Sequence, residues 1–308
     1  MQAFAAIARN PYIRYNKDKE LQMAVNTKPY EELTYTDDFM FKRVMLRETI
    51  CRRVLERILG KPVREIRFHE AEKVMKDSPS SKGIRLDVYL QTDNTAYDIE
   101  MQTKPEPAIG RRSRYYQSSM DMDSLFAGKR YSELKDGVVI FICLTDPYNR
   151  KLARYTLRET CAEADDLDPK VGTVKIFLYA GGDTSQESRE MRQFLDYIHR
   201  GIVPEGDDLI RDIDDTVRFE RQDTRGKEKY RMYSIKAMDL KDEGRDEGRA
   251  EGRAEGKAEE RANNVLQLMK ALDLTFDKAA DYLNIKEEDR DECRALIEKM
   301  KEKQPAGV

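Results

Sequence analysis

The 308-residue sequence predicts an α/β fold, a mixed sheet flanked by helices, with a charged helical extension after it. Three observations support this prediction. Residues 84–90 and 97–102 alternate between apolar and polar side chains, as half-buried strands do. Residues 137–146 form a nearly continuous apolar run, which is typical of a strand buried on both faces. Residues 36–60 carry apolar side chains at helical spacing, so helices and strands interleave along the chain.

Two short helices are expected between Thr36 and Gly60, with a break near Arg47. Thr36 or Asp37 can cap the first helix, because a side-chain oxygen there accepts a hydrogen bond from a free backbone N–H. Gly60 suits a helix end, and Pro62 after it cannot continue the helix.

A β-hairpin is expected after these helices. Residues 63–75 are predicted to form a strand and 78–83 a loop, and turn residues at 91–95 separate the two alternating runs. The later elements are expected to be a helix at 110–128, strands at 137–146 and 173–180, and an amphipathic helix at 188–201.

Composition narrows the function. Lys and Arg (56) nearly balance Asp and Glu (59), so any nucleic-acid surface has to be a local patch. With two histidines in the chain, catalysis built on several histidines is not expected. The four cysteines have neither metal-ligand spacing nor a dense disulfide pattern, which favours a reducing cytoplasm. No apolar run is long enough to span a membrane, and no secretory signal is recognisable.

The predicted hairpin brings acidic side chains together. With a loop at 92–95, the parity of the strands predicts three polar cross-strand pairs on one face: Tyr89 with Asp98, Asp87 with Glu100, and Arg85 with Gln102. The apolar side chains of both strands then share the other face, including Ile84, Leu86, Val88 and Leu90. A register shift of one residue would place polar side chains opposite apolar ones. The hydrophobic pattern alone therefore predicts two adjacent carboxylates.

Two interpretations of this acidic face stay open on the residues alone. Opposed carboxylates repel, so a hard cation such as Mg²⁺, which prefers oxygen ligands, would explain the pair. Bound to phosphate, such a cation polarises the phosphoryl oxygen, helps to generate a hydroxide nucleophile and stabilises the leaving oxygen. Alternatively, the acids form an ordinary solvated sheet face and Arg85 pairs with a neighbouring acid. The hairpin by itself slightly favours this second interpretation.

The motifs taken together resemble a known family. Asp87, followed by Glu100-Met101-Gln102 on the next strand, is similar to the D…(D/E)-x-K core of the PD-(D/E)XK nuclease superfamily. More narrowly, the chain resembles the Rpn family of recombination-promoting nucleases, the PD-(D/E)XK family transposases. Four stretches carry this resemblance in the family's order: TDDFMFKRVM, KGIRLDVYLQTDNTAYDIEMQ, RRSRYYQSSMDMDSLFAGKRYSEL and VVIFICLTDPY. A Glu-Gly-Arg run after the core is also typical of the family.

The resemblance implies a restriction-endonuclease-like core and metal-dependent hydrolysis of DNA phosphodiester bonds, linked to recombination or mobile elements. It implies three catalytic residues: Asp87, Glu100 and Gln102. It implies Mg²⁺ or another divalent cation as cofactor, with three carboxylate ligands: Asp87, Glu100 and Asp38. Further residues are expected to contact the DNA backbone or to support the site: Lys42, Arg112 and Tyr116, which match family positions, and Arg85.

The chain departs from the superfamily pattern in two places. Leu86 stands where a proline precedes the aspartate, and Gln102 stands where the superfamily has a lysine. A glutamine lacks the positive charge with which a lysine stabilises the developing phosphorane and orients water. The family commonly has glutamine at this position, so more of the electrostatic work falls on the metal ion.

Six segments are predicted along the chain: an N-terminal extension (1–32), a nuclease-like domain (33–205), a charged connector (206–240), a Glu-Gly-Arg repeat helix or linker (241–262), a small helical module (263–303) and a tail (304–308). In the repeat, each glycine costs about 1 kcal/mol relative to alanine, and like charges lie four residues apart. Alone, the repeat is therefore a marginal helix or a solvated linker. Two copies can set an acidic row against a basic row, so we expect a long exposed helix that promotes self-association.

The sequence therefore predicts a cytoplasmic, Mg²⁺-dependent DNA endonuclease with no membrane partner. Two other functions stay open. The first is a catalytically weak or inactive nuclease fold that acts as a DNA-binding or assembly module. The second is an interaction protein in which the charged C-terminal helix is the working part.

Overall fold

The computed structural model describes residues 28–75, 84–125, 128–164 and 166–303. The predicted loop at 78–83, the tail at 304–308 and most of the predicted N-terminal extension lie outside these residues. The chain divides into two compact units, Met1–Tyr233 and Ser234–Val308.

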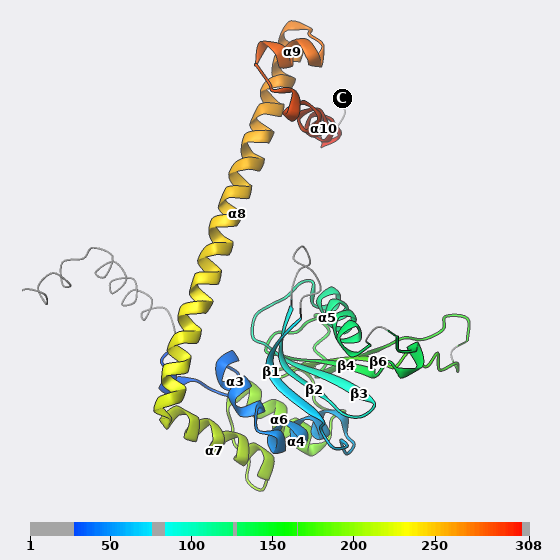
Figure 1. The fold of residues 1–308 in the computed structure, drawn as a ribbon, viewed down its shortest axis with the longest axis vertical. Coiled ribbons are helices and arrows are strands. Elements are labelled where there is room, and N and C mark those ends of the chain that lie inside the picture. The colour runs from blue at the N-terminus through cyan, green and yellow to red at the C-terminus, as the bar shows by residue number, and fades with distance from the viewer. Residues whose placement is uncertain (1–27, 76–83, 126–127, 165, 304–308) are drawn as a thin grey trace, which may run out of the picture. The chain divides into compact units, whose positions relative to one another are not determined.

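A mixed sheet of six strands forms the centre of the described part of the first unit (Figure 1). Its strands are β1 (Phe68–Met75), β2 (Ile84–Gln91), β3 (Thr95–Gln102), β4 (Asp136–Cys143), β5 (Arg154–Arg158) and β6 (Thr173–Tyr179). They lie in the order β1-β2-β3-β4-β6-β5. β3, β4 and β6 are parallel, whereas β1, β2 and β5 each run antiparallel to the neighbour that follows in sequence. The apolar run predicted as a doubly buried strand is β4, in the middle of the sheet.

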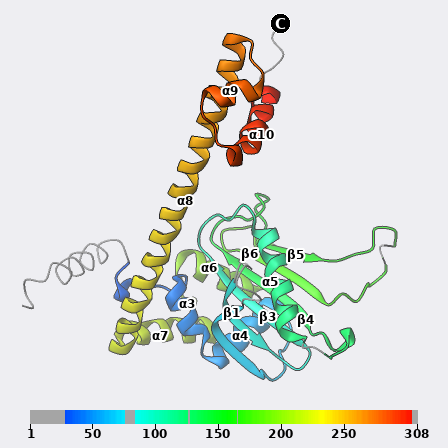
Figure 2. The ribbon, with the colours of Figure 1, turned by 45° about the horizontal axis from the view of Figure 1, so that its top comes forward.

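Helices cover both faces of the sheet (Figure 2). Four helices pack with one face in a single core cluster: α3 (Asp38–Met45), α4 (Glu48–Leu59), α6 (Arg189–Arg200) and α7 (Asp208–Gln222). Helix α5 (Ile109–Ser124) packs on the other face, where Tyr116 and Met120 contact the cluster that contains Phe141. The site described below lies between these layers.

Predicted helix boundaries agree closely with the observed ones. The break near Arg47 is confirmed, because Arg47 is the residue before α4. Gly60 ends α4 with φ at +66°, a region that glycine adopts without strain. Strand β5 was not predicted, because this short exposed edge strand has no regular apolar alternation.

The predicted parity of β2 is wrong at its centre. Val88 and Leu90 pack on the α3–α4 side, whereas Ile84 and Leu86 pack on the α5 side. The cause lies in β1, where Glu72 has φ at +59° and its pairing with β2 is missing from an otherwise continuous register. A non-glycine residue in this left-handed region re-aims the strand. The strand pair therefore exchanges faces opposite Asp87.

The segment expected as a charged connector contains structured helices. Helix α7 buries Leu209, Ile210 and Ile213 in the core of the first unit. Helix α8 (Thr224–Leu272) then runs without interruption through the Glu-Gly-Arg repeat. Tyr30, inside the predicted N-terminal extension, is also buried, and its hydroxyl donates to the carbonyl of Glu220 at 2.6 Å.

The second unit contains a small helical core of its own. The end of α8 packs with α9 (Phe276–Tyr282) and α10 (Glu287–Lys303). Val265, Ala279 and Ile297 are among the buried side chains. In the described residues of both units, no helix is long and apolar enough to cross a membrane.

Asp207 joins α7 to α4 and is expected to matter for stability. Its Oδ1 accepts hydrogen bonds from the backbone of Leu209 and Ile210 at 3.1 Å each, and its two oxygens accept from Arg57 at 2.7 and 3.0 Å. Asp207→Ala removes a helix cap and leaves the half-buried guanidinium of Arg57 without its partner. We expect the free energy of unfolding, measured in urea at pH 7, to fall by about 3 kcal/mol.

Asp208→Ala is the matched control, because the Asp208 side chain is 72% exposed in the same helical turn. Its loss is expected to stay below about 0.5 kcal/mol. Burial raises the pKa of Asp207, but Arg57 and the backbone donors lower it further, so the net pKa is lowered from 3.8. The Asp207 carboxylate therefore contributes fully to the free energy of unfolding above pH 3.8, and this contribution is lost as the pH falls through its folded-state pKa. Equal losses in both variants would contradict this account.

Candidate active site

Two carboxylates bridge β2 and β3 where the ladder between these strands ends. Val88 and Ile99 form the last regular pair. Beyond it, the backbone N–H of Asp87 donates to Glu100 Oε1 at 2.7 Å, and the N–H of Met101 donates to Asp87 Oδ2 at 3.2 Å. Each carboxylate thus takes the place of a ladder carbonyl across the opening strands. Asp87 is 8% exposed and Glu100 is 2% exposed.

The predicted pairs are therefore met in part. Tyr89 pairs with Asp98 and Gln91 with Ala96, as the turn geometry predicts. Asp87 and Glu100 are adjacent across the strands, but through backbone-to-carboxylate bonds instead of a ladder pair. The expected pairing of Arg85 with Gln102 does not occur in the described register.

A third carboxylate, Asp98, lies beside the pair and was not predicted as a site residue. It is fully buried, and neither of its carboxylate oxygens has a hydrogen-bond partner among the described residues. Asp98 stands two residues before Glu100, so the alternation of β3 puts both on one face. That shared parity was the signal that could have identified it.

Burial and nearby carboxylates raise the pKa of all three carboxyl groups; at Asp87 the nearby carboxylate is Asp38, and Lys42 opposes the rise. Burial is the largest cause in each case. The Asp87 carboxylate adds to it at Glu100, whose pKa rises to about 8. Glu100 and Asp87 add to it at Asp98, whose pKa lies well above its usual value. The site therefore holds protons tightly at neutral pH unless a cation offsets the negative charge.

Lys42 on α3 contacts this cluster from one side of the sheet. Its ammonium lies 2.7 Å from Asp38 Oδ1, 3.2 Å from Asp87 Oδ1 and 3.3 Å from Glu72 Oε1. Burial lowers the pKa of Lys42, but Asp87 and Asp38 outweigh this effect and raise it, so the side chain stays charged. Asp38 also accepts a hydrogen bond from the hydroxyl of Tyr233.

Arg112 on α5 contacts the cluster from the other side. Its guanidinium donates to Glu100 Oε2 and to Gln102 Oε1, both at 3.0 Å, and to the hydroxyl of Tyr116 at 2.8 Å. The Gln102 amide nitrogen donates in the opposite direction, to the carbonyl of Lys104 at 2.7 Å. Gln102, Arg112 and Tyr116 thus form one bonded group with Glu100.

Part of this group of residues lines an open cleft with a volume of about 840 Å³. Its lining includes Asp38, Asp87 and Tyr116, and four arginines: Arg85, Arg111, Arg112 and Arg114. Arginine is well suited to phosphate because its planar fork donates two parallel hydrogen bonds. The cleft therefore combines the buried carboxylate of Asp87 with an arginine-rich wall.

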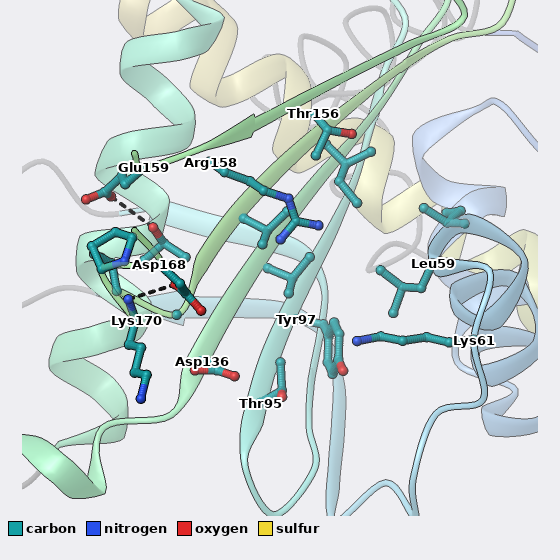
Figure 3. A pocket seen from close by; sticks show the side chains of 18 of the residues that line it. Leu59, Lys61, Thr95, Tyr97, Asp136, Thr156, Arg158, Glu159, Asp168 and Lys170 are labelled. Carbon is teal, nitrogen blue, oxygen red and sulfur yellow. Dashed lines mark hydrogen bonds between the residues drawn. The ribbon is translucent and has the colours of Figure 1, made fainter. Parts of the chain in front are cut away.

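Figure 3 shows a second cavity, of about 670 Å³, bordered by β3, β4, β5 and β6 and by the end of α4. Lys61 and Arg158 extend toward it, and Glu159 accepts a hydrogen bond from Thr173 at 2.9 Å. Its acidic residues, among them Asp136, are exposed and are not paired with one another as Asp87 and Glu100 are. The first cleft is therefore the better candidate for catalysis.

The structure brings most of the predicted site residues together. Asp38 and Lys42 contact Asp87, and Gln102, Arg112 and Tyr116 group with Glu100. Arg85 lines the cleft but lies 3.5 Å from Glu72 and contacts neither member of the pair. Glu72 was also missed by the sequence analysis, because its contact with Lys42 depends on an unusual backbone conformation that no local pattern signals.

Comparison with known proteins gives a family match for part of the chain. Residues 35–165 match the family model described as PD-(D/E)XK nuclease family transposase. No curated protein and no solved structure matches the chain significantly. The matched segment spans α3 to β5 and includes the carboxylate pair, Lys42 and Arg112. Residues 35–165 are thus similar to the PD-(D/E)XK nuclease family transposases, and the six-stranded mixed sheet flanked by helices is consistent with a restriction-endonuclease-like α/β fold.

Proposed function

We propose that residues 33–205 form a divalent-metal-dependent endonuclease that hydrolyses phosphodiester bonds in DNA, of the Rpn type, and that serves recombination or mobile-element movement. One observation carries this proposal: the buried Asp87 lines an arginine-rich cleft, and the buried Glu100 lies directly beside Asp87. The family match supports the nuclease class.

The donor set suits a hard cation. Among the described residues, no three His, Cys, Asp or Glu side chains converge closely enough to hold a metal ion by themselves. Mg²⁺, however, commonly binds one or two carboxylates and completes its shell with water and substrate phosphates. Asp98 adds a third buried carboxyl group beside Asp87 and Glu100, so the cluster holds more carboxyl groups than the two cations Lys42 and Arg112 can pair. The residues present therefore fit a cation held by Asp87 and Glu100, with Asp38 nearby.

The protein's own groups would prepare the reaction. The cleft arginines would bind phosphates on either side of the scissile bond, which fixes the register of the duplex. Lys42 would hold the Asp87 carboxylate in place through its ion pair, in which the two groups are 3.2 Å apart. When bound, the metal ion would polarise the phosphoryl oxygen and lower the pKa of a water molecule. Gln102 carries no charge. The cation that pairs with Glu100 is the guanidinium of Arg112, at 3.0 Å.

A second function has a specific observation in its favour. Lys42 and Arg112 already pair with Asp87 and Glu100, and Gln102 lacks a charge. A nuclease fold that binds DNA through its arginines with little or no cleavage is consistent with these ion pairs. DNA binding without any metal-dependent cleavage would favour this function.

Divalent cations are expected to stabilise the protein in a pH-dependent manner. Because the pKa of Glu100 is raised from 4.5 to about 8, the folded state binds a proton that the unfolded state has lost. Metal-free stability therefore falls as the pH rises through this window. A cation needs the deprotonated carboxylates, so its effect grows over the same window. At a concentration about 100 times Kd the gain is about 2.7 kcal/mol, which raises Tm by about 5–10 °C for a domain of this size.

Thermal unfolding with MgCl₂ or CaCl₂ at pH 6.0 and pH 8.5 measures this effect. The shift in Tm should be larger at the higher pH and should disappear in Asp87→Asn/Glu100→Gln. An equal shift in that double variant would show that the cation binds elsewhere.

Loss of either carboxylate is expected to abolish cleavage while the fold persists. Asp87→Asn and Glu100→Gln should each lower the rate of supercoiled-plasmid nicking with Mg²⁺ by at least about 100-fold, comparable to the loss of one electrostatic group at a transition state. EDTA should abolish nicking by the wild type. Circular dichroism should show native secondary structure in each variant.

Asp136→Asn is the matched control, because Asp136 is an exposed carboxylate that lines the second cavity (Figure 3). It should nick plasmid at the wild-type rate. Equal nicking by wild type and Asp87→Asn in highly purified samples would rule out the assigned site.

We also propose that the Glu-Gly-Arg repeat promotes self-association, with the alternative that it is a solvated helix or linker. Where the structure describes the glycines, at Gly248, Gly252 and Gly256, no atom beyond their own helix lies within 4 Å of an added Cβ. The neighbouring Arg249, Arg253 and Glu255 are exposed. These features support a second copy as a partner.

For localisation we keep the cytoplasmic expectation, which rests on cysteine usage.

Truncation tests the self-association directly. A chain that ends after Leu240 should sediment as a monomer under conditions in which the full chain forms a dimer that dissociates with added salt. If the full chain and the truncated chain have the same oligomeric state, the segment is a linker and does not promote self-association.

A further inference from the structure

Arg112 and Gln102 act as one unit beside Glu100. Of the five N–H donors of the Arg112 guanidinium, three are used for Glu100, Gln102 and Tyr116. The guanidinium also lies over the ring of Tyr116, 5.0 Å from its centroid, and 5.5 Å from that of Phe141. Its side chain is 32% exposed and lines the cleft. The contacts fix the plane of the guanidinium, while two N–H donors remain for a ligand in the cleft.

Gln102 has the properties of a residue that orients an arginine. Its amide oxygen accepts from Arg112, and its amide nitrogen donates to the carbonyl of Lys104, so the two bonds fix which end of the amide faces the guanidinium. A lysine at residue 102 could accept no hydrogen bond from Arg112, and its ammonium would repel the guanidinium. A neutral residue at 102 is therefore compatible with Arg112 on α5, whereas a lysine is not.

We propose that Arg112 supplies the positive charge that stabilises the developing negative charge on the scissile phosphate, and that Gln102 is its positioning residue. This inference rests on the proposed nuclease function. The positive charge of Arg112 is thus supplied by helix α5, whereas Glu100 and Gln102 lie on strand β3. Donors fixed in advance of the reaction stabilise a transition state most effectively, because they need no reorganisation. Tyr116 and Phe141 complete the support of the guanidinium plane.

A purely structural role of Arg112 as the counter-ion of Glu100 makes different predictions. Lys42 is an example of such a counter-ion, because it pairs with the Asp87 carboxylate from the other side of the sheet. A counter-ion would affect folding and metal binding, and Gln102 would matter little. A charge aimed at the phosphate would affect kcat, and its replacement at residue 102 would restore activity.

Four variants test the proposal: Arg112→Gln, Gln102→Lys, the double variant and Gln102→Leu. Arg112→Gln should lower kcat by about 10²–10³-fold with KM changed by less than about threefold, as expected for an interaction made in the transition state. Gln102→Leu keeps the charge but removes the acceptor, so kcat should fall by at least about tenfold. Gln102→Lys should lower kcat in the wild-type background and raise it by at least about tenfold in the Arg112→Gln background.

That reversal of sign is the decisive result, because a structural arginine does not produce it. Metal binding gives a readout independent of activity: the Ca²⁺-dependent rise in Tm without DNA should be equal or larger in Arg112→Gln, since a competitor for Glu100 is gone. Arg158→Gln, an exposed arginine at the second cavity (Figure 3), is the matched control and should match wild type in every assay.

The outcomes separate this inference from the proposed function. Two results would overturn the role of Arg112 and leave the proposed nuclease function standing. The first is a cleavage rate that is the same in wild type and Arg112→Gln. The second is a double variant that is no more active than Arg112→Gln. A Ca²⁺ shift lost in Arg112→Gln also overturns it, in favour of a role in metal assembly. No metal-dependent cleavage by wild type overturns both proposals.

Discussion

The structure around the cleft depends on two backbone-to-carboxylate hydrogen bonds, from the N–H of Asp87 to Glu100 and from the N–H of Met101 to Asp87. Each carboxylate accepts a bond from the partner strand, so the strands separate without leaving buried N–H groups unpaired. Burial of charge at this point is costly unless it is paired. Lys42 approaches Asp87 from α3, and Arg112 approaches Glu100 from α5. Because these helices lie on opposite faces of the sheet, the carboxylate pair connects both layers of the domain.

This arrangement explains why several residues adopt unusual states. Glu72 has a left-handed backbone conformation at the place where β1 and β2 lose a pair, and its carboxylate reaches Lys42. Asp98 stays buried without a hydrogen-bond partner in the described chain. Both features cost stability. Their concentration at one site, next to raised carboxyl pKa values, is typical of a functional centre rather than of a solvated sheet face.

The sequence predicted the parts of this site that follow from local periodicity. Alternation along residues 84–102 was sufficient to predict the hairpin and the pairing of Tyr89 with Asp98. It could not predict the exchange of faces at Asp87, because that depends on the backbone of Glu72 in another strand. The hydroxyl of Tyr233, which contacts Asp38 across 195 residues of sequence, is a tertiary contact of the same kind. The roles assigned to Asp87, Glu100 and Gln102 remain predictions from family resemblance, now with a defined geometry.

The central claim is that the Asp87–Glu100 pair is a cation site. The most direct measurement is a crystal structure of the protein grown with Mn²⁺, with diffraction data collected at the manganese absorption edge. The account predicts an anomalous difference peak within about 2.5 Å of oxygens from both carboxylates. Absence of a peak there, with the lysine and arginine contacts of both carboxylates unchanged at saturating Mn²⁺, would contradict it.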